Sequence, residues 1–387
     1  MPACVVLRQF WYNKWVRFLI IDIGSESVGA AGVEVQKGVP VMPTDRQARI
    51  VFVERAPIPL ASELQPAHFF SATAHALEQV CARIRTPVTR VHLFLHSPWV
   101  VSKTRAWRAE FPTTTLLTEK VLATAVQEAE RGIEENFRAA YKEVASAVRR
   151  VERALVEFRV NGYSVASACG KEARTLEFSL LESFAPENAL VKFNSLVERV
   201  TAAPRVWGAG AAAIALAPRV AMGDYTDVLT VVAGGEAIEL ALVRAGAPSA
   251  ILSVPVSLRT LARDMYRSGA LSSVSTAEAF LIAPESALAA LAPARRAQVE
   301  RARTEAYARI AQAVREALAP YERDGARFTS VFVFSPEKYA AFFMRALAPF
   351  NPVIPDTGAF AGKIEWRVRE SVDPVFLAET AFVFGCK

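Results

Sequence analysis

One acidic residue interrupts an apolar stretch near the start of the chain, and it stands just before a glycine turn. The stretch FLIIDIGSESVGAAGVEV runs from Phe18 to Val35, with Asp22 at the end of the first apolar run and Gly24-Ser25 at the turn. A carboxylate in a buried strand usually has a partner or a chemical task, because leaving it unpaired is costly. Its simplest structural role is to cap the turn by accepting hydrogen bonds from backbone N–H groups.

Histidine and cysteine, the other common metal ligands, do not suggest a site. His92 and His96 lie on one face of a predicted strand in RVHLFLHSPWVV, at a spacing that could hold a metal ion. No acid or cysteine in that stretch joins them, so we expect a solvated strand face. The four cysteines form no CxxC pair and no cluster with histidine. This pattern predicts neither a zinc site nor a disulfide framework, and it favours a reducing compartment.

Hydrophobic periodicity indicates the elements that must position Asp22. Residues 17–35 are expected to form two strands joined by the turn, and ARIVFVERAPI a third strand. HFFSATAHALEQVCARIR has apolar residues every three or four positions, which predicts a helix. Further along, Thr118 is expected to cap a helix and Asn161-Gly162 to form a hairpin turn.

A second stretch repeats the layout of the first after about 210 residues. DVLTVVAGGEAIELALVRAGAPSAILSVPV reads as a strand, a Gly-Gly turn and two further strands. In both stretches the strand after the turn contains one acid, Glu34 in the first and Glu239 in the second. The repeat predicts two related lobes that each begin with the same hairpin.

Size and composition describe a globular protein of more than one lobe. A chain of 387 residues exceeds what one ordinary core serves. Hydrophobic residues make up 52% and charged residues 22%, and no run of about 18 strongly apolar residues suggests a membrane span. The net charge of +6 includes three basic residues within the first 20 positions, which hold no acid. The remainder is nearly balanced, so nucleic acid is not an expected partner.

The N-terminal segment is both basic and aromatic. Trp11, Lys14, Trp15 and Arg17 belong to it, in the stretch CVVLRQFWYNKWVRF. Such a segment can lie on an anionic membrane surface, with its aromatic rings at the depth of the headgroups. The alternative is that it leads into the first strand and packs on the body of the protein.

Taken in order, these landmarks resemble the ATPase fold shared by actin, hexokinase and the heat-shock chaperones. Within that fold the chain is similar to the bacterial branch that holds FtsA and PilM, and most similar to FtsA. IDIGSESVGAAGVEV resembles the first phosphate-binding loop and VVAGGEAIELALV the second, while ILSVPVSLRTLARDM and STAEAFL match the segments that follow. SPWVVSKTRAWRAEFPTTTLLTEKVLATAVQEA, followed by VERALVEFRVNGYSV, is similar to the small subdomain that FtsA inserts, called 1C.

The resemblance implies an α/β, bilobed, actin-like (ribonuclease H-like) ATPase fold with an inserted small α+β subdomain. The implied domains are an N-terminal basic-aromatic segment (1–16), the first part of lobe 1 (17–87), the inserted 1C-like subdomain (88–168), the continuation of lobe 1 with a crossover (169–222), lobe 2 (223–334) and a C-terminal strand–helix return (335–387).

In that fold, two glycine-turn hairpins face each other across a cleft, and their backbone N–H groups cradle the phosphates of a nucleotide. The resemblance implies that Asp22 holds a Mg²⁺ ion through water, and that Ser25 and Ser27 donate their hydroxyl groups to phosphate oxygens. The candidate nucleotide-binding residues are Asp22, Gly24, Ser25, Ser27, Gly234, Gly235, Glu236 and Asp264.

Several positions depart from the family pattern. Val232 stands where the second loop has its acid, and Ala237 and Ile238 stand where hydroxyl residues are expected. Glu236 would repel phosphates unless a cation intervenes, and the lysine of the following helix is Leu281. Because phosphoryl transfer needs a positioned metal, cradle and attacking water, we expect little or no hydrolysis and at most weak binding of ATP and Mg²⁺.

The resemblance therefore predicts a non-catalytic or weakly nucleotide-binding scaffold of the FtsA type, linking a cell-division assembly to the cytoplasmic membrane. One alternative is a PilM-like platform of pilus assembly that binds a short peptide from a membrane partner. Another is a protein of the same fold that binds and hydrolyses ATP. The expected partners are proteins of a division or pilus assembly, with self-association and a membrane surface also open. The expected place is the cytoplasm, at the inner face of its membrane.

Overall fold

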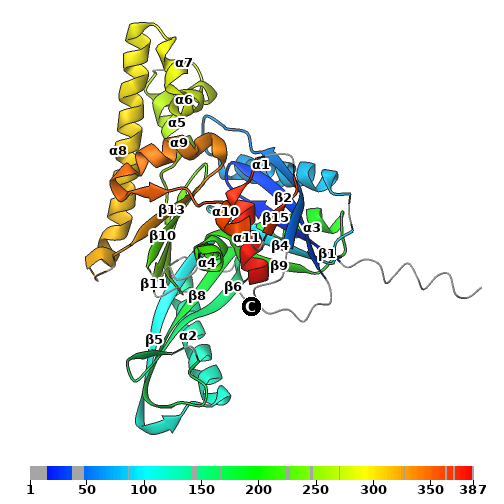
Figure 1. The fold of residues 1–387 in the computed structure, drawn as a ribbon, viewed down its shortest axis with the longest axis vertical. Helices are drawn as coiled ribbons and strands as arrows, with labels where there is room; N and C mark the ends of the chain where they lie inside the picture. The colour runs from blue at the N-terminus through cyan, green and yellow to red at the C-terminus, as the bar shows by residue number, and fades with distance from the viewer. Residues whose placement is uncertain are drawn as a thin grey trace, which may run out of the picture.

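The computed structural model describes residues 15–36, 48–85, 87–140, 147–165, 167–222, 227–244, 247–269, 271–323, 325, 327–361, 364–368 and 371–385. This part of the chain contains three sheets, and three clusters of buried apolar side chains accompany them. Figure 1 shows two lobes next to each other and an elongated subdomain that projects below them.

Lobe 1 is built on a six-stranded sheet in the order β15-β3-β2-β1-β4-β9. Its strands are β1 (Trp15–Ile23), β2 (Ser27–Gln36), β3 (Ala48–Pro57), β4 (Arg90–Leu95), β9 (Arg205–Ala209) and β15 (Ile364–Trp366). Its helices are α1 (Pro66–Arg83), α3 (Glu187–Glu198), α4 (Gly210–Met222), α10 (Gly358–Ala361) and α11 (Pro374–Gly385). Strands β1 and β4 are parallel neighbours, so the residues that follow them meet at one edge of the sheet.

Lobe 2 is built on a five-stranded sheet in the order β12-β11-β10-β13-β14. Its strands are β10 (Val228–Ala233), β11 (Ile238–Arg244), β12 (Ala247–Val254), β13 (Ser330–Phe334) and β14 (Pro352–Val353). Its helices are α5 (Leu258–Arg267), α6 (Val274–Ile282), α7 (Glu285–Ala289), α8 (Pro293–Arg323), α9 (Glu337–Ala346) and the 3-10 helix η3 (Ala348–Phe350). The long helix α8 runs along the outer side of this lobe in Figure 1.

The predicted repeat is present in the structure. The order β3-β2-β1-β4-β9 of lobe 1 corresponds to β12-β11-β10-β13-β14 of lobe 2. Both turns close in the same way, because the Gly24 N–H donates to the Ser27 carbonyl and the Gly234 N–H to the Ala237 carbonyl, each at 3.1 Å. The two apolar runs on either side of each glycine turn were therefore enough to predict both hairpins.

The inserted subdomain spans residues 101–186 and carries the third sheet, in the order β5-β8-β6-β7. Its elements are β5 (Val101–Leu116), α2 (Glu119–Ala140), β6 (Val148–Val160), β7 (Tyr163–Val165) and β8 (Glu172–Pro186). These bounds differ from the expected 88–168 at both ends. The strand β4 lies in lobe 1 because it pairs with β1 and β9, and β8 lies in the insertion because it pairs with β5 and β6.

The N-terminal boundary also differs from the expectation, because β1 begins at Trp15. The guanidinium of Arg49 lies 3.6 Å from the centre of the Trp15 ring, and Arg17 Nε donates to Glu34 Oε1 at 2.7 Å. Trp15 and Arg17 thus have partners within lobe 1, which the membrane-contact hypothesis did not anticipate. Trp11 and Lys14 lie outside the described residues.

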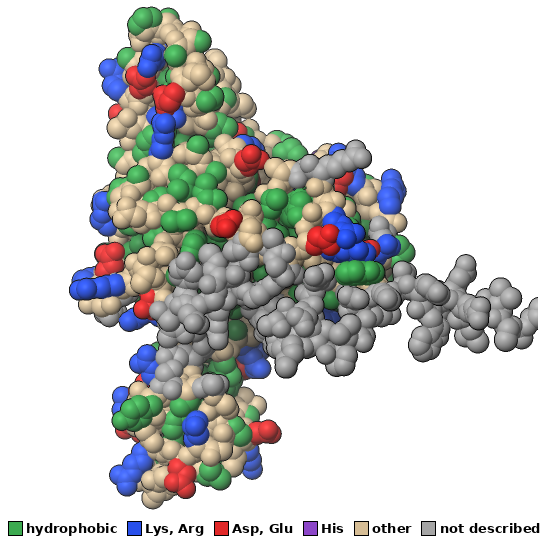
Figure 2. Space-filling model, in the orientation of Figure 1, with side chains coloured by type: hydrophobic (Ala, Val, Ile, Leu, Met, Phe, Trp, Pro, Cys, Tyr) green, Lys and Arg blue, Asp and Glu red, His purple; other side chains and the backbone are tan. Residues whose placement is uncertain are grey.

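The described residues include no helix that is long and apolar enough to cross a membrane. On the face drawn in Figure 2, basic and acidic side chains are interspersed over lobe 2 and the inserted subdomain. This mixture agrees with the nearly balanced charge of the sequence beyond its N-terminal segment.

Candidate functional site

Asp22 lies at the carboxyl end of β1, with 4% of its surface exposed. Its Oδ2 accepts a hydrogen bond from Arg55 Nη1 at 2.7 Å, and Arg55 Nε donates to Asp373 Oδ2 at 2.7 Å. The same Nη1 donates to the hydroxyl of Ser27 at 3.2 Å. The Gly24 turn closes on its own backbone, so the buried carboxylate is stabilised by an ion pair with Arg55 and not by the turn N–H groups.

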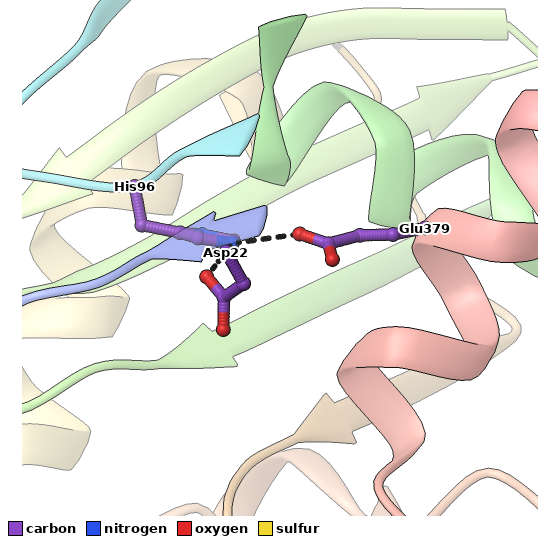
Figure 3. Close-up of side chains that lie close together, drawn as sticks. All are labelled: Asp22, His96 and Glu379. Carbon is purple, nitrogen blue, oxygen red and sulfur yellow. Dashed lines mark ion pairs between the residues drawn. The ribbon is translucent and has the colours of Figure 1, made fainter. Parts of the chain in front are cut away.

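His96 follows β4 directly and is also buried, with 6% exposed. Its Nδ1 lies 2.8 Å from Glu239 Oε2, and the other oxygen of Glu239 accepts the Ser97 N–H at 3.1 Å. Its Nε2 lies 3.4 Å from Asp22 Oδ1 and 3.5 Å from Glu379 Oε1. Figure 3 shows the imidazole reaching between Asp22 and Glu379, which come from β1 and α11.

The expectation of a solvated face for His96 was wrong. Strand β4 lies between β1 and β9 in its sheet, and the residues that follow it, His96 and Ser97, contact Glu239 of lobe 2. The acids that surround the ring are remote in sequence, on β1, β11 and α11. The fit of the ring is visible only in the structure: Gly210 begins α4, and a Cβ at this position would lie 2.0 Å from His96 Nε2. Only glycine leaves room for the ring.

The carboxylates around His96 alter its acid–base properties. Burial alone would lower the pKa of His96, but the hydrogen bond to Glu239 and the nearby Glu379 and Asp22 raise that pKa well above its usual value. Burial also raises the pKa of Glu379 to about 8, and the charge of Asp22 adds to this effect. Glu379 has no exposed surface, and neither of its oxygens has a hydrogen-bond partner among the described residues.

The two glycine turns touch each other directly. The hydroxyl of Ser25 accepts a hydrogen bond from the Glu236 N–H at 2.9 Å. A Cβ on Gly235 would lie 2.8 Å from the Cβ of Glu26, and Arg259 Nη1 donates to the Ser25 carbonyl at 3.2 Å. A cavity of about 40 Å³ remains beside the turns. A buried water needs roughly 10–15 Å³, so the cavity has room for a few waters.

In lobe 2, helix α5 and its N-cap Ser257 supply the side chains that bind the Gly234–Glu236 turn. Arg263 forms a two-pronged ion pair with Glu236, and both side chains are about 5% exposed. Ser257 donates its hydroxyl to the Gly234 carbonyl, and its N–H donates to Thr260 Oγ1 at 2.7 Å. The charge of Glu236 is therefore balanced by Arg263, a cation that the protein itself supplies. The two arginines spaced four apart in SLRTLARDM were the signal that could have revealed it.

Asp264, the last of the candidate nucleotide-binding residues, lies away from the two glycine turns. Its carboxylate pairs with Arg309 Nη2 at 2.8 Å and with Arg267 at 3.5 Å, and its side chain is 38% exposed. It is not among the residues that line the cavity between the turns. Helix α5 directs Arg259 and Arg263 toward the lobe contact, so Asp264 faces α8.

The residues at the turns do not fit the phosphate chain of a nucleotide in this arrangement. The Ser25 hydroxyl is hydrogen-bonded to the backbone of lobe 2, the Ser27 hydroxyl accepts from Arg55, and Glu236 is paired with Arg263. The two loops that would cradle phosphates contact each other, and one oxygen of Asp22 is held by Arg55.

Comparison with solved structures identifies the fold. The chain matches a structure described as "PilM-PilN type IV pilus biogenesis complex" with a TM-score of 0.64 and 15% identity, over 96% of this chain and 99% of that one. Weaker matches, which carry no argument, include the ROK hexokinase of Thermus thermophilus (TM-score 0.35, 12% identity, 95% and 98% covered) and a PPX-GPPA enzyme of Aquifex aeolicus (0.34, 12%, 83% and 68%). No family model and no curated protein matches.

The fold class predicted from the sequence is thus confirmed, since the chain has a bilobed α/β architecture of the actin-like ATPase type with an inserted subdomain. The structural match is to a PilM–PilN complex, whereas the sequence motifs predicted that the chain is most similar to FtsA. At 15% identity the likeness shows the fold alone.

Proposed function

We propose that this protein is a non-hydrolysing, actin-like scaffold with a role like that of PilM in the assembly of type IV pili. The likeness to a PilM structure extends over nearly the whole of both chains. This proposal replaces the prediction of an FtsA-type role in cell division, because the structural comparison favours PilM.

The observation that carries the proposal is the direct packing of the two glycine turns. Phosphoryl transfer requires a cradle for the phosphates, a metal ion and an attacking water. Here the Ser25 hydroxyl accepts a hydrogen bond from the Glu236 N–H, and the Glu236 carboxylate is paired with Arg263, so each turn already has a partner where phosphates would bind. A scaffold needs the rigid two-lobed body that this packing provides, and it needs no turnover.

Calorimetric titration of the full chain with ATP and Mg²⁺, beside the Asp22→Ala variant, tests the non-catalytic part. We expect no binding in the micromolar range for either protein. Micromolar binding that disappears in Asp22→Ala would mean that the lobes open to a working nucleotide site, and it would overturn this part.

Deletion of the gene in its source organism tests the proposed role in pilus assembly. We expect loss of surface pili with normal cell length, and restoration of pili by the wild-type gene. Elongated, undivided cells that keep their pili would instead support the FtsA-type role.

The partner in this proposal is a membrane-bound pilus protein that presents a short cytoplasmic peptide. Co-purification with such a partner is the expected outcome. Co-sedimentation with anionic vesicles, with and without residues 1–16, separates attachment through a partner from attachment through the basic-aromatic segment. Equal pelleting of both forms would exclude that segment as the anchor.

A further inference from the structure

We propose that Asp22, His96 and Glu379 form a binding site for one divalent transition-metal ion, with Zn²⁺ as the best fit. The ligand atoms would be Asp22 Oδ1, His96 Nε2 and a carboxylate oxygen of Glu379. This site differs from the water-mediated Mg²⁺ site that the resemblance implies, and it is independent of the proposed function.

The positions of the three groups suit a shared ion. His96 Nε2 lies 3.4 Å from Asp22 Oδ1 and 3.5 Å from Glu379 Oε1, and one ligand atom from each residue lies within 4.8 Å of the others. Two ligands bound about 2.0–2.1 Å from a tetrahedral ion are separated by roughly 3.4 Å. Figure 3 shows the three side chains converging on one point from three different elements.

The same atoms are left without hydrogen bonds. Asp22 Oδ1, His96 Nε2 and both oxygens of Glu379 are buried and have no hydrogen-bond partner among the described residues. The three residues are 4%, 6% and 0% exposed, so water does not replace the missing partners at the surface. Buried polar atoms are rarely left unsatisfied, and one ion would satisfy an atom of each side chain.

Neighbouring groups hold two of the three ligands in position. Glu239 lies 2.8 Å from His96 Nδ1, so the imidazole donates its Nδ1–H to this carboxylate and directs the Nε2 lone pair toward Asp22 and Glu379. Arg55 binds Asp22 Oδ2 and leaves Oδ1 free. A carboxylate on the far nitrogen of a histidine is the usual second shell of a protein metal site.

The charges of the cluster also call for a cation. Asp22, Glu239, Glu379 and Asp373 are acidic, and Arg55 is shared between Asp22 and Asp373. The competing occupants are protons on His96 and on Glu379. A single Nε2–H of His96 could satisfy only one of the two carboxyl groups that lie at 3.4 and 3.5 Å, and a proton on Glu379 could pair with only one of His96 and Asp22, whereas a divalent ion reaches all three side chains.

The ligand set selects the class of ion. Mg²⁺ prefers six oxygen ligands in octahedral geometry and retains several waters, which this enclosed site with an imidazole nitrogen does not offer. Zn²⁺ accepts imidazole nitrogen and carboxylate oxygen in a four-coordinate shell, in which a water can be the fourth ligand. Bound there, it would join β1, the end of β4 and α11, while Glu239 connects His96 to lobe 2.

The test uses the full chain, freed of tags and stripped of metal with a chelator. Calorimetric titration with ZnCl₂ should give one site per chain, and MgCl₂ should bind at least 100-fold more weakly. Substitution with Co²⁺ should give the intense visible absorption of a low-symmetry, four-coordinate ion. Glu379→Gln and His96→Gln should each weaken Zn²⁺ binding 100-fold or more, and Glu239→Gln roughly 10- to 100-fold.

Further variants separate loss of Zn²⁺ binding from loss of folding. Glu379→Gln preserves the shape of the side chain and removes a buried charge, so it should fold even if His96→Gln does not. His75→Gln and Glu285→Gln alter exposed residues elsewhere and should bind Zn²⁺ like the wild type. Equal affinity in Glu379→Gln and the wild type, or no Zn²⁺ binding by the folded wild type, would overturn the proposal.

Discussion

The turn of the β1–β2 hairpin and the turn of the β10–β11 hairpin have the same backbone and carry a glutamate at the same position. In lobe 1 it is Glu26, and in lobe 2 it is Glu236. Glu236 is paired on both oxygens with buried Arg263, whereas Oε2 of Glu26 has no hydrogen-bond partner among the described residues. The same local structure therefore holds a carboxylate in two electrostatic states, because different elements pack on it.

The strands beside the turns differ in a second way. In lobe 1 the acid Asp22 stands opposite Gly29, and in lobe 2 Val232 stands opposite the acid Glu239. Each hairpin thus supplies one carboxylate, but from opposite strands of the ladder. Both carboxylates reach His96, so the hairpin of lobe 2, which has Val232 where lobe 1 has Asp22, supplies its acid from the opposite strand.

Removal of the cation in lobe 2 should have the largest effect. Arg263→Met leaves Glu236 buried and unpaired, and we expect a loss of about 3–5 kcal/mol in the free energy of unfolding, measured with urea. The double variant Arg263→Met/Glu236→Gln should recover much of that loss. Arg296→Met, which removes an exposed pair with Glu300, should leave the free energy of unfolding nearly unchanged. Similar losses in the free energy of unfolding for Arg263→Met and Arg296→Met would show that burial does not strengthen the Arg263–Glu236 pair.

Glu26 should make the stability of the protein depend on pH. Burial raises the pKa of Glu26 from 4.5 to about 7, so between these values the unfolded chain loses a proton that the folded chain retains. The free energy of unfolding should therefore fall as the pH rises from about 4.5 to 7, by an amount on the order of 3 kcal/mol.

The variant Glu26→Gln should lack this contribution, whereas Glu285→Gln, at an exposed position, should follow the wild type. Urea unfolding across this pH range measures the difference. Parallel pH profiles for Glu26→Gln and the wild type would show that Glu26 ionises normally in the folded protein.

Gly29 tests the closeness of packing around Asp22. A Cβ at Gly29 would lie 2.7 Å from Phe376 Cζ and 2.9 Å from Arg55 Nη1, so Gly29→Ala should destabilise the protein by about 1–3 kcal/mol. Gly132→Ala is the matched control, because Gly132 lies within helix α2, where alanine is favoured by roughly 0.5–1 kcal/mol. The melting temperatures should move in opposite directions, and a neutral Gly29→Ala would show that Arg55 can withdraw from Asp22.

Local chemistry explains why so much of the fold could be predicted. The Val121 N–H donates to Thr118 Oγ1 at 3.3 Å, as expected of a helix cap. Asn161 and Gly162 adopt φ values of 52° and 83°, which is the left-handed backbone that this hairpin turn requires. Such features depend on residues only a few positions apart, so the pattern of the sequence contains them.

The candidate site was predictable only in part, for the same reason. Asp22 and the two glycine turns were found because they lie within one hairpin each. Arg55, Arg263 and Glu379 were missed, as were the burial of His96 and the exposed position of Asp264. No local pattern distinguishes a buried arginine partner from a solvated one, since the distinction depends on what packs against it.

The sequence by itself determined the two hairpins, the presence of an inserted subdomain and the helix cap at Thr118, because periodicity and turn residues act over short distances. Only the tertiary structure decided that Asp22 pairs with Arg55 and faces His96, that Glu239 and Glu379 join them, and that the two turns close on each other. The physical reason is that ion pairs between remote elements form at the positions where packing removes water, and those positions exist only once the lobes have come together.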